Sequence, residues 1–200
     1  MANFVYTSVQ VERGNDAAYA AMKAINQRVA DIDAAMRANG DRFNHVNCYE
    51  LWADTQALAD TSNWSTLFDE IGSKWAYVED GDDNYIRLCS AWGYPEGVCL
   101  RIAREVMAAD PEALVSISYE DEGPNFIGSA LYADGEMYDE EYISSESYNH
   151  YGLKFWWDEE EEGCEEPDDF EPTWEEAHEI RERDIAEMIR YYDESKEEGE

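Results

Sequence analysis

His45 and Cys48 have the chemistry and the spacing of half a structural zinc site, because they lie three positions apart. A structural zinc ion takes four ligands, usually in two such pairs. The second pair is missing, since Cys89, Cys99 and Cys164 are scattered and form no C-x-x-C pair. We therefore expect no metal site, and we expect Cys89 and Cys99 to face the core as small apolar side chains.

The other histidines do not complete a catalytic site. A serine or cysteine nucleophile needs a histidine base and an orienting carboxylate, and no G-x-S-x-G elbow accompanies His150 or His178. The sequence contains no glycine-rich phosphate loop.

The acidic stretches around Gly81 and over 158–162 lack the twelve-residue spacing of a calcium loop. Paired carboxylates of the glycosidase kind arise by chance in so acidic a chain. The sequence predicts neither an enzyme nor a cofactor.

Carboxylates are the chemical group that dominates the sequence. The chain has 48 Asp and Glu against 14 Lys and Arg, a formal net charge of -34. Residues 134–200 hold 27 of the acidic and 5 of the basic side chains, so a third of the chain carries about two thirds of the net charge. This balance argues against direct binding to nucleic acid or to an anionic membrane surface, because both depend on Lys and Arg.

The acidic chain is nevertheless predicted to fold. Disordered segments are poor in aromatic residues, whereas this chain of 200 residues has 7 Trp, 14 Tyr and 6 Phe. Its apolar runs fall short of the about 20 residues that a membrane span needs, and its start carries no signal-peptide pattern. Its 4 cysteines are few for a disulfide scaffold. We expect a folded, reduced, cytoplasmic protein.

Hydrophobic periodicity divides the chain into helices and strands. Val5, Thr7, Val9 and Val11 share one face of a first strand, and an amphipathic helical stripe from Tyr19 follows. The predicted elements are a strand over 4–11, a helix over 16–39, short helices over 49–58 and 64–71, strands over 74–79 and 84–92 with a turn at Asp80-Gly81, a helix over 95–109, strands over 114–120, 126–133 and 137–143, and a helix over 173–192 that opens with a capping box at Thr173.

The order of these elements predicts an α+β fold. Through residue 120 it is strand, helix, strand, strand, helix, strand, the split β-α-β pattern of ferredoxin-like antiparallel sheets. We expect this sheet to gain extra strands, a helical insert at 41–73 and a C-terminal acidic helix. The chain then divides into a ferredoxin-like domain over 1–145, an acidic, aromatic-rich linker over 146–172, and the acidic helix and tail over 173–200.

A series of short motifs resembles the YubB-type ferredoxin-like family of phages and plasmids over roughly residues 1–140. The resemblance implies a ferredoxin-like fold and a mobile-element origin, and it carries no catalytic residues. The insert and the acidic C-terminal segment depart from the family pattern. The motifs that carry the resemblance are the Met1-Ala2-Asn3 opening, Gly72-Ser73-Lys74-Trp75, Ala91-Trp92 with Pro95, Ser118-Tyr119-Glu120-Asp121-Glu122, Phe126-Ile127-Gly128 with Tyr132, and Gly135-Glu136.

The density of carboxylates favours nucleic-acid mimicry as the function. Duplex DNA carries one negative charge per ~1.7 Å of axis, so 34 charges match roughly 58 Å of duplex. Together with the resemblance, this predicts an inhibitor of a host DNA- or RNA-binding protein, such as a defence nuclease, restriction complex or CRISPR effector. The predicted acidic contacts are Asp139, Glu140, Glu141, Asp158, Glu159, Glu160, Glu161, Glu162, Glu165, Glu166, Asp168, Asp169, Glu175, Glu176 and Glu179, and the aromatic contacts are Tyr148, Tyr151, Trp156 and Trp157.

Two other function classes stay open. In an assembly module, the sheet or the 173–192 helix binds a partner through apolar contacts such as Ile185, Met188 and Ile189, and the acids only keep the protein soluble. An enzyme with a site that no motif reveals is the third reading. The oligomeric state is also open, and a dimer is compatible with the sequence.

Overall fold

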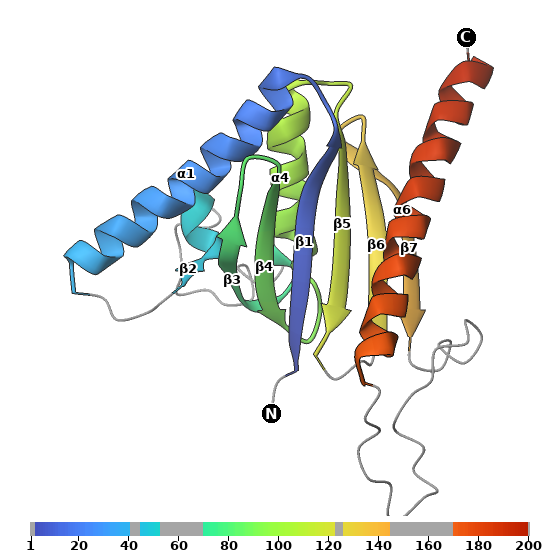
Figure 1. Cartoon of the computed structure of the whole chain (residues 1–200). Helices are drawn as coiled ribbons and strands as arrows, with labels where there is room; N and C mark the ends of the chain where they lie inside the picture. Colours follow the sequence, from blue (N-terminus) through green and yellow to red (C-terminus); the bar gives the residue numbers. More distant parts are fainter. Residues whose placement is uncertain (1–2, 41–44, 53–69, 123–125, 145–169, 200) are drawn as a thin grey trace, which may run out of the picture.

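A computed structural model describes residues 3–40, 45–52, 70–122, 126–144 and 170–199. These residues form an α+β body built on one antiparallel sheet of seven strands, in the order β2-β3-β4-β1-β5-β6-β7 (Figure 1). The strands are β1 (Phe4–Arg13), β2 (Val46–Asn47), β3 (Lys74–Gly81), β4 (Tyr85–Ala91), β5 (Leu114–Asp121), β6 (Phe126–Ala133) and β7 (Glu136–Ser144), and the helices are α1 (Asp16–Ala38), the 3-10 helix η1 (Cys48–Trp52), α4 (Glu96–Ala109) and α6 (Phe170–Gly199).

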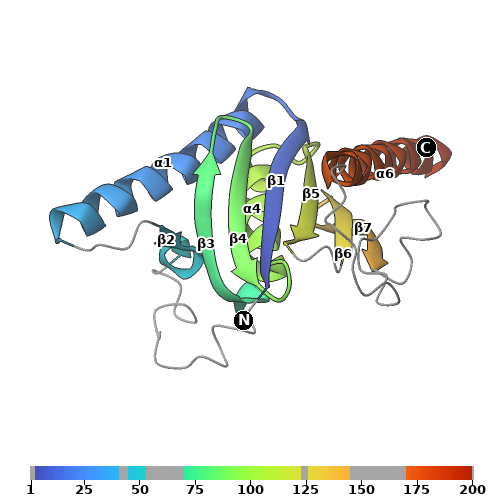
Figure 2. The ribbon, with the colours of Figure 1, turned by 60° about the horizontal axis from the view of Figure 1, so that its bottom comes forward.

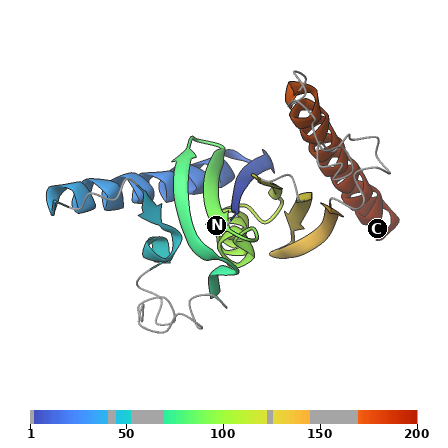
Figure 3. The same cartoon turned by 90° about the horizontal axis from the view of Figure 1, so that it is seen from below.

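The main core lies between one face of the sheet and the helices α1 and α4. The predicted alternation of β1 is confirmed, since Val5, Val9 and Val11 are buried in this core with Met22 and Ile25 of α1. Both helices present the apolar stripe that the sequence predicts, because residues three and four apart share a helix face. Helix α1 continues past the β3 side of the sheet, whereas α6 lies on the β7 side (Figures 2 and 3).

Helix α6 packs on the opposite face of the sheet, over β5, β6 and β7. Ala177 and Ile180 contact Ile127 and Ile143 in one apolar cluster. A second cluster joins Met188 and Tyr192 of α6 to apolar side chains of β5 and β6. Within the described residues, no helix covers the remainder of this face, formed by β1, β3 and β4. The C-terminal acidic helix is therefore part of the folded body.

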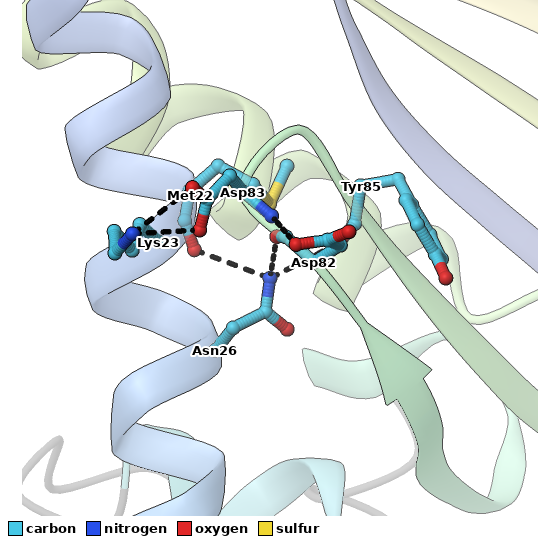
Figure 4. Close-up of polar contacts among 6 residues, drawn as sticks. All are labelled: Met22, Lys23, Asn26, Asp82, Asp83 and Tyr85. Carbon is cyan, nitrogen blue, oxygen red and sulfur yellow. Dashed lines mark hydrogen bonds and ion pairs between the residues drawn. The ribbon is translucent and has the colours of Figure 1, made fainter.

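The predicted hairpin of β3 and β4 is confirmed, but its turn lies further along the chain than Asp80-Gly81. Gly81 is the last residue of β3, and the chain turns over 82–84. The carboxamide nitrogen of Asn26 on α1 donates hydrogen bonds to the carbonyl oxygens of Asp82 (2.6 Å) and Tyr85 (3.0 Å) (Figure 4). A Cβ at Gly81 would overlap the Asn26 side chain. The glycine marks this close approach of helix and hairpin, and it does not mark the turn itself.

Helix α6 also differs from its prediction. It begins at Phe170, so Thr173 lies inside it and the predicted capping box is wrong. Pro172 does not prevent this start, because proline fits the first helical turn, where its missing N–H has no partner to lose. The helix continues beyond Tyr192 to Gly199, and in this extension Lys196 forms an exposed ion pair of 2.9 Å with Asp134 in the turn between β6 and β7.

The predicted insert at 41–73 contains a strand as well as helical structure. Val46 of β2 pairs with Val78 of β3, which adds an edge strand that the sequence did not predict. The helix expected over 49–58 is a 3-10 helix at Cys48–Trp52 in the described part, and residues 53–69 lie outside the described residues. The α+β class is thus confirmed, and the sheet has seven strands where a ferredoxin-like sheet has four.

Candidate functional site

The predicted contact residues fall into three groups. Asp139, Glu140 and Glu141 lie exposed on β7, and Glu179 lies exposed on α6. The backbone of Glu175 and Glu176 belongs to α6, but their side chains lie outside the described part. The remaining predicted contacts all lie outside the described residues, and they are Tyr148, Tyr151, Trp156, Trp157, Asp158, Glu159, Glu160, Glu161, Glu162, Glu165, Glu166, Asp168 and Asp169.

Carboxylates of β7 and α6 converge at the edge of the sheet. Partial burial raises the pKa of Glu141, and the negative charges of Asp184, Asp139 and Glu187 raise it further. The structure therefore brings Asp139 and Glu141 together with Asp184 and Glu187, and we call these four residues the β7–α6 acidic surface. Arg183 partly balances it, with its guanidinium 3.0 Å from the Asp184 carboxylate.

Glu140 does not belong to this surface. Neighbouring residues of a strand point to opposite faces of the sheet, so Glu140 points away from the face that carries Asp139 and Glu141. Its carboxylate accepts a hydrogen bond of 2.8 Å from the Tyr119 hydroxyl. The Tyr119 ring in turn stacks on Tyr94, with 4.2 Å between ring centroids. Glu140 thus supports the buried tyrosines of the core side.

Ion pairs hold α6 in place on the sheet. The Arg181 guanidinium lies 2.5 Å from the Glu120 carboxylate of β5, in a nearly buried position. Arg13 of β1 pairs with Asp193 at 2.8 Å in a more exposed position. These contacts and the two apolar clusters order the helix, so the acidic side chains of α6 project from a packed element and not from a flexible tail.

A groove of about 740 Å³ runs along α6 over the uncovered part of the sheet. Its lining side chains include charges of both signs and aromatic rings. This mixture does not favour one class of ligand, such as anions, cations or apolar molecules, over the others. Its charged lining residues include Arg87, Arg181, Glu79 and Glu120, and Arg181 is ion-paired with Glu120. The other side chains that line it are Tyr6, Thr7, Ser8, Gln10, Tyr85, Ser118 and His178.

His45 and Cys48, which have the spacing of half a zinc site, lie in different surroundings. The His45 ring lies against Tyr77 at an interplanar angle of 31°, with 4.5 Å between ring centroids, whereas Cys48 is buried and burial raises the pKa of its thiol. In the part of the chain that the structure describes, no group of three or more His, Cys, Asp and Glu side chains is placed to hold a metal ion.

Cys89 and Cys99 are both buried, but only one of them faces the main core. Cys99 lies in that core, as the sequence predicts. Cys89 pairs with Tyr6 of β1 on the opposite face of the sheet. Burial raises the pKa of both thiols, and a thiol is a poor nucleophile when its pKa is raised.

No protein-family model matches the chain, and neither a curated protein nor a solved structure matches it. The resemblance to the YubB-type family therefore stays a prediction. Of the helices in the described residues, none has both the length and the apolar character that crossing a membrane requires.

Proposed function

We propose that this protein binds a nucleic-acid-binding protein of a host cell, in the class of defence nucleases and restriction or CRISPR complexes, and inhibits it by nucleic-acid mimicry. The observation that carries the proposal is the convergence of carboxylates from β7 and α6 on a scaffold held by ion pairs and apolar clusters, where the negative charges add to the effect of burial on the pKa of Glu141. Neither catalysis nor a cofactor is part of the proposal, and the inhibition is by occupation of a basic groove.

The packed scaffold matters because it lowers the cost of binding. Association must order the groups that form the interface, and a flexible acidic tail would lose much of its binding energy in this way. Carboxylates that are already held by a strand and a helix lose less. They also displace counterions from a basic groove as phosphates do, and the net charge of -34 would steer the two proteins together.

We further propose that the four strands β3-β4-β1-β5 with α1 and α4 form a ferredoxin-like unit. Strand β4 lies between β3 and β1, and β1 lies between β4 and β5, all antiparallel, which is the arrangement that two split β-α-β units generate. This arrangement is the one that the YubB-type resemblance implies, and the proposed origin in a mobile element rests on that resemblance alone. On this view β6, β7 and α6 are an extension that carries the acidic surface.

The assembly-module alternative has less support. Its proposed contacts included the apolar stripe of α6, but Met188 is buried on the protein's own sheet. Ile189 packs partly buried beside it. These two side chains are therefore used within the chain, whereas the half-buried Ile185 lines a groove beside the helix.

Charge reversal on the acidic surface tests the proposal. We expect Glu141→Lys with Glu187→Lys to abolish capture of the target from host lysate, while Asp31→Lys with Glu112→Lys, which changes the net charge equally at exposed sites elsewhere, leaves capture largely intact. Captured proteins should be nucleic-acid-binding, and both added duplex DNA and high salt should release them. Capture that resists DNA, salt and the first double variant would contradict mimicry.

A further inference from the structure

Four exposed aromatic side chains gather at one end of the uncovered sheet face. Phe4 and Tyr6 are 37% and 36% exposed, and Trp75 and Trp92 are 54% and 53% exposed. The backbone connects them, because Phe4 and Lys74 both pair with Ala91, and the Trp92 amide donates to the carbonyl of Asn3. We call these four aromatic residues the aromatic patch. Exposed apolar groups that cluster in this way mark interaction sites.

The backbone holds the two tryptophans in an unusual conformation. Trp75 has φ 51° and Trp92 has φ 69°, in the left-handed region that bulky residues rarely adopt. Trp75 also lies where the β3–β4 pairing shifts register, between Lys74 and Tyr77, and such irregularities re-aim side chains. The two indoles meet with 5.6 Å between ring centroids at an interplanar angle of 42°. Two independent backbone distortions thus create one exposed indole pair.

The surroundings of the aromatic patch suit a cation. The Lys74 ammonium lies 5.1 Å from the centroid of the Trp92 ring, so one indole face already attracts a positive charge. Glu79 and Glu120 line the same groove as Tyr6, and the backbone amide of Glu122 donates to the carbonyl of Phe4. Burial raises the pKa of Tyr6, and Cys89 and these three carboxylates raise it further. Aromatic faces bordered by carboxylates favour arginine, because a guanidinium plane stacks on rings and forms forked hydrogen bonds with carboxylates.

We propose that the aromatic patch binds arginine side chains on the basic surface of the partner protein. The inference rests on the proposed function for the cationic character of the partner, but it places an arginine contact at a site that none of the predicted contact residues occupies. Trp and Tyr are the residues that most often carry interface binding energy. The β7–α6 acidic surface then supplies long-range attraction, and the indole pair supplies the preference for arginine over lysine.

Binding of labelled oligoarginine and oligolysine peptides of equal length to the full chain tests this inference. We expect the protein to bind oligoarginine roughly five- to tenfold more tightly than oligolysine, as a cation–π contact predicts. The double variant Trp75→Gly with Trp92→Gly should lose this preference and keep its affinity for oligolysine. Glycine is the chosen replacement because it accepts a positive φ without strain. Tyr191→Ala, an exposed aromatic residue of α6 outside the patch, is the matched control.

Indole N–H signals in NMR spectra, assigned from the single glycine variants, give a second readout. Selective shifts of the Trp75 and Trp92 signals with oligoarginine support the inference. An arginine preference that survives the double glycine variant overturns it and leaves the proposed function intact. If neither peptide binds, the proposed function fails together with the inference. Equal shifts of these signals with a single-stranded oligonucleotide would assign the patch to base stacking and overturn the inference. A dimer of the protein that the double glycine variant abolishes would assign the patch to self-association and also overturn it.

Discussion

Gly97 lies in the first turn of α4, where the helix approaches the backbone carbonyl of Glu70. A Cβ at this position would overlap that carbonyl oxygen, which cannot move away as a flexible side chain could. The ion pair between Arg101 and Glu70 holds the same two segments together. A single hydrogen in place of a side chain therefore sets how closely α4 packs against the chain that enters β3.

Gly97→Ala should destabilise the fold by about 1–3 kcal/mol, the usual cost of overpacking. The sign of the change in unfolding free energy is informative, because in a helix without such a contact alanine is more stabilising than glycine by about 1 kcal/mol. Gly93→Ala is the control, since a Cβ there meets nothing within 4 Å, and it should change stability by less than about 0.5 kcal/mol. Urea unfolding of the three proteins measures both effects, and a stabilised Gly97→Ala variant would refute the close approach.

At the scale of elements, the docking of α6 decides whether the protein presents an ordered acidic surface. An isolated helix of this composition would gain little from its apolar stripe, because helices in water depend on tertiary packing for their stability. Met188 and Tyr192 provide that packing on β5 and β6. The acidic residues of α6 are therefore only as well ordered as this apolar contact is strong.

Met188→Ala should destabilise the docking of α6 by about 2–4 kcal/mol, because it removes a buried side chain and leaves a cavity. Hydrogen exchange should quicken first in α6 and less in β1, since elements can unfold locally. Glu187→Ala, a substitution at the exposed neighbouring position, is the control and should leave exchange unchanged or slower. Equal acceleration in α6 and β1 would instead show that the helix and the sheet unfold as one unit.

The sequence predicts which segments form strands and helices better than it predicts the residues at which they begin and end. Strand β6 matches its predicted range, because apolar residues between turn signals define it locally. Asp134 and Gly135 form the turn between β6 and β7, with φ 54° and 86°. Asp-Gly is a sequence signal for a tight hairpin turn, so this dipeptide could have predicted that β6 and β7 pair directly. The two-residue strand β2 has no local signature, since only its pairing with β3 makes it a strand.

At the scale of the whole molecule, net repulsion opposes the compact state. The charge of -34 favours expansion. At Glu141, burial raises the pKa of the carboxyl, and the negative charges of Asp184, Asp139 and Glu187 raise it further. A carboxyl whose pKa is higher in the folded than in the unfolded state binds more protons when folded. Stability therefore falls as pH rises from the usual value near 4.5 through the raised value.

Thermal unfolding at low ionic strength should show a higher Tm at about pH 5 than at pH 7, and added salt at pH 7 should raise Tm by screening the repulsion. Glu141→Gln should reduce the dependence on pH, because it removes the group whose pKa is raised. A Tm that rises steadily from pH 5 to pH 7 would contradict this account of the charge.

Local patterns in the chain were sufficient for the α+β class, for the apolar faces of β1, α1 and α4, and for the acidity of β7 and α6, because side-chain periodicity and composition depend only on neighbouring residues. The meeting of Glu141 with Asp184 and Glu187 depends on which strands α6 covers. The pairing of Trp75 with Trp92 depends on the register between β3 and β4. These contacts join residues far apart in the sequence, and only the packing of the whole sheet brings them together.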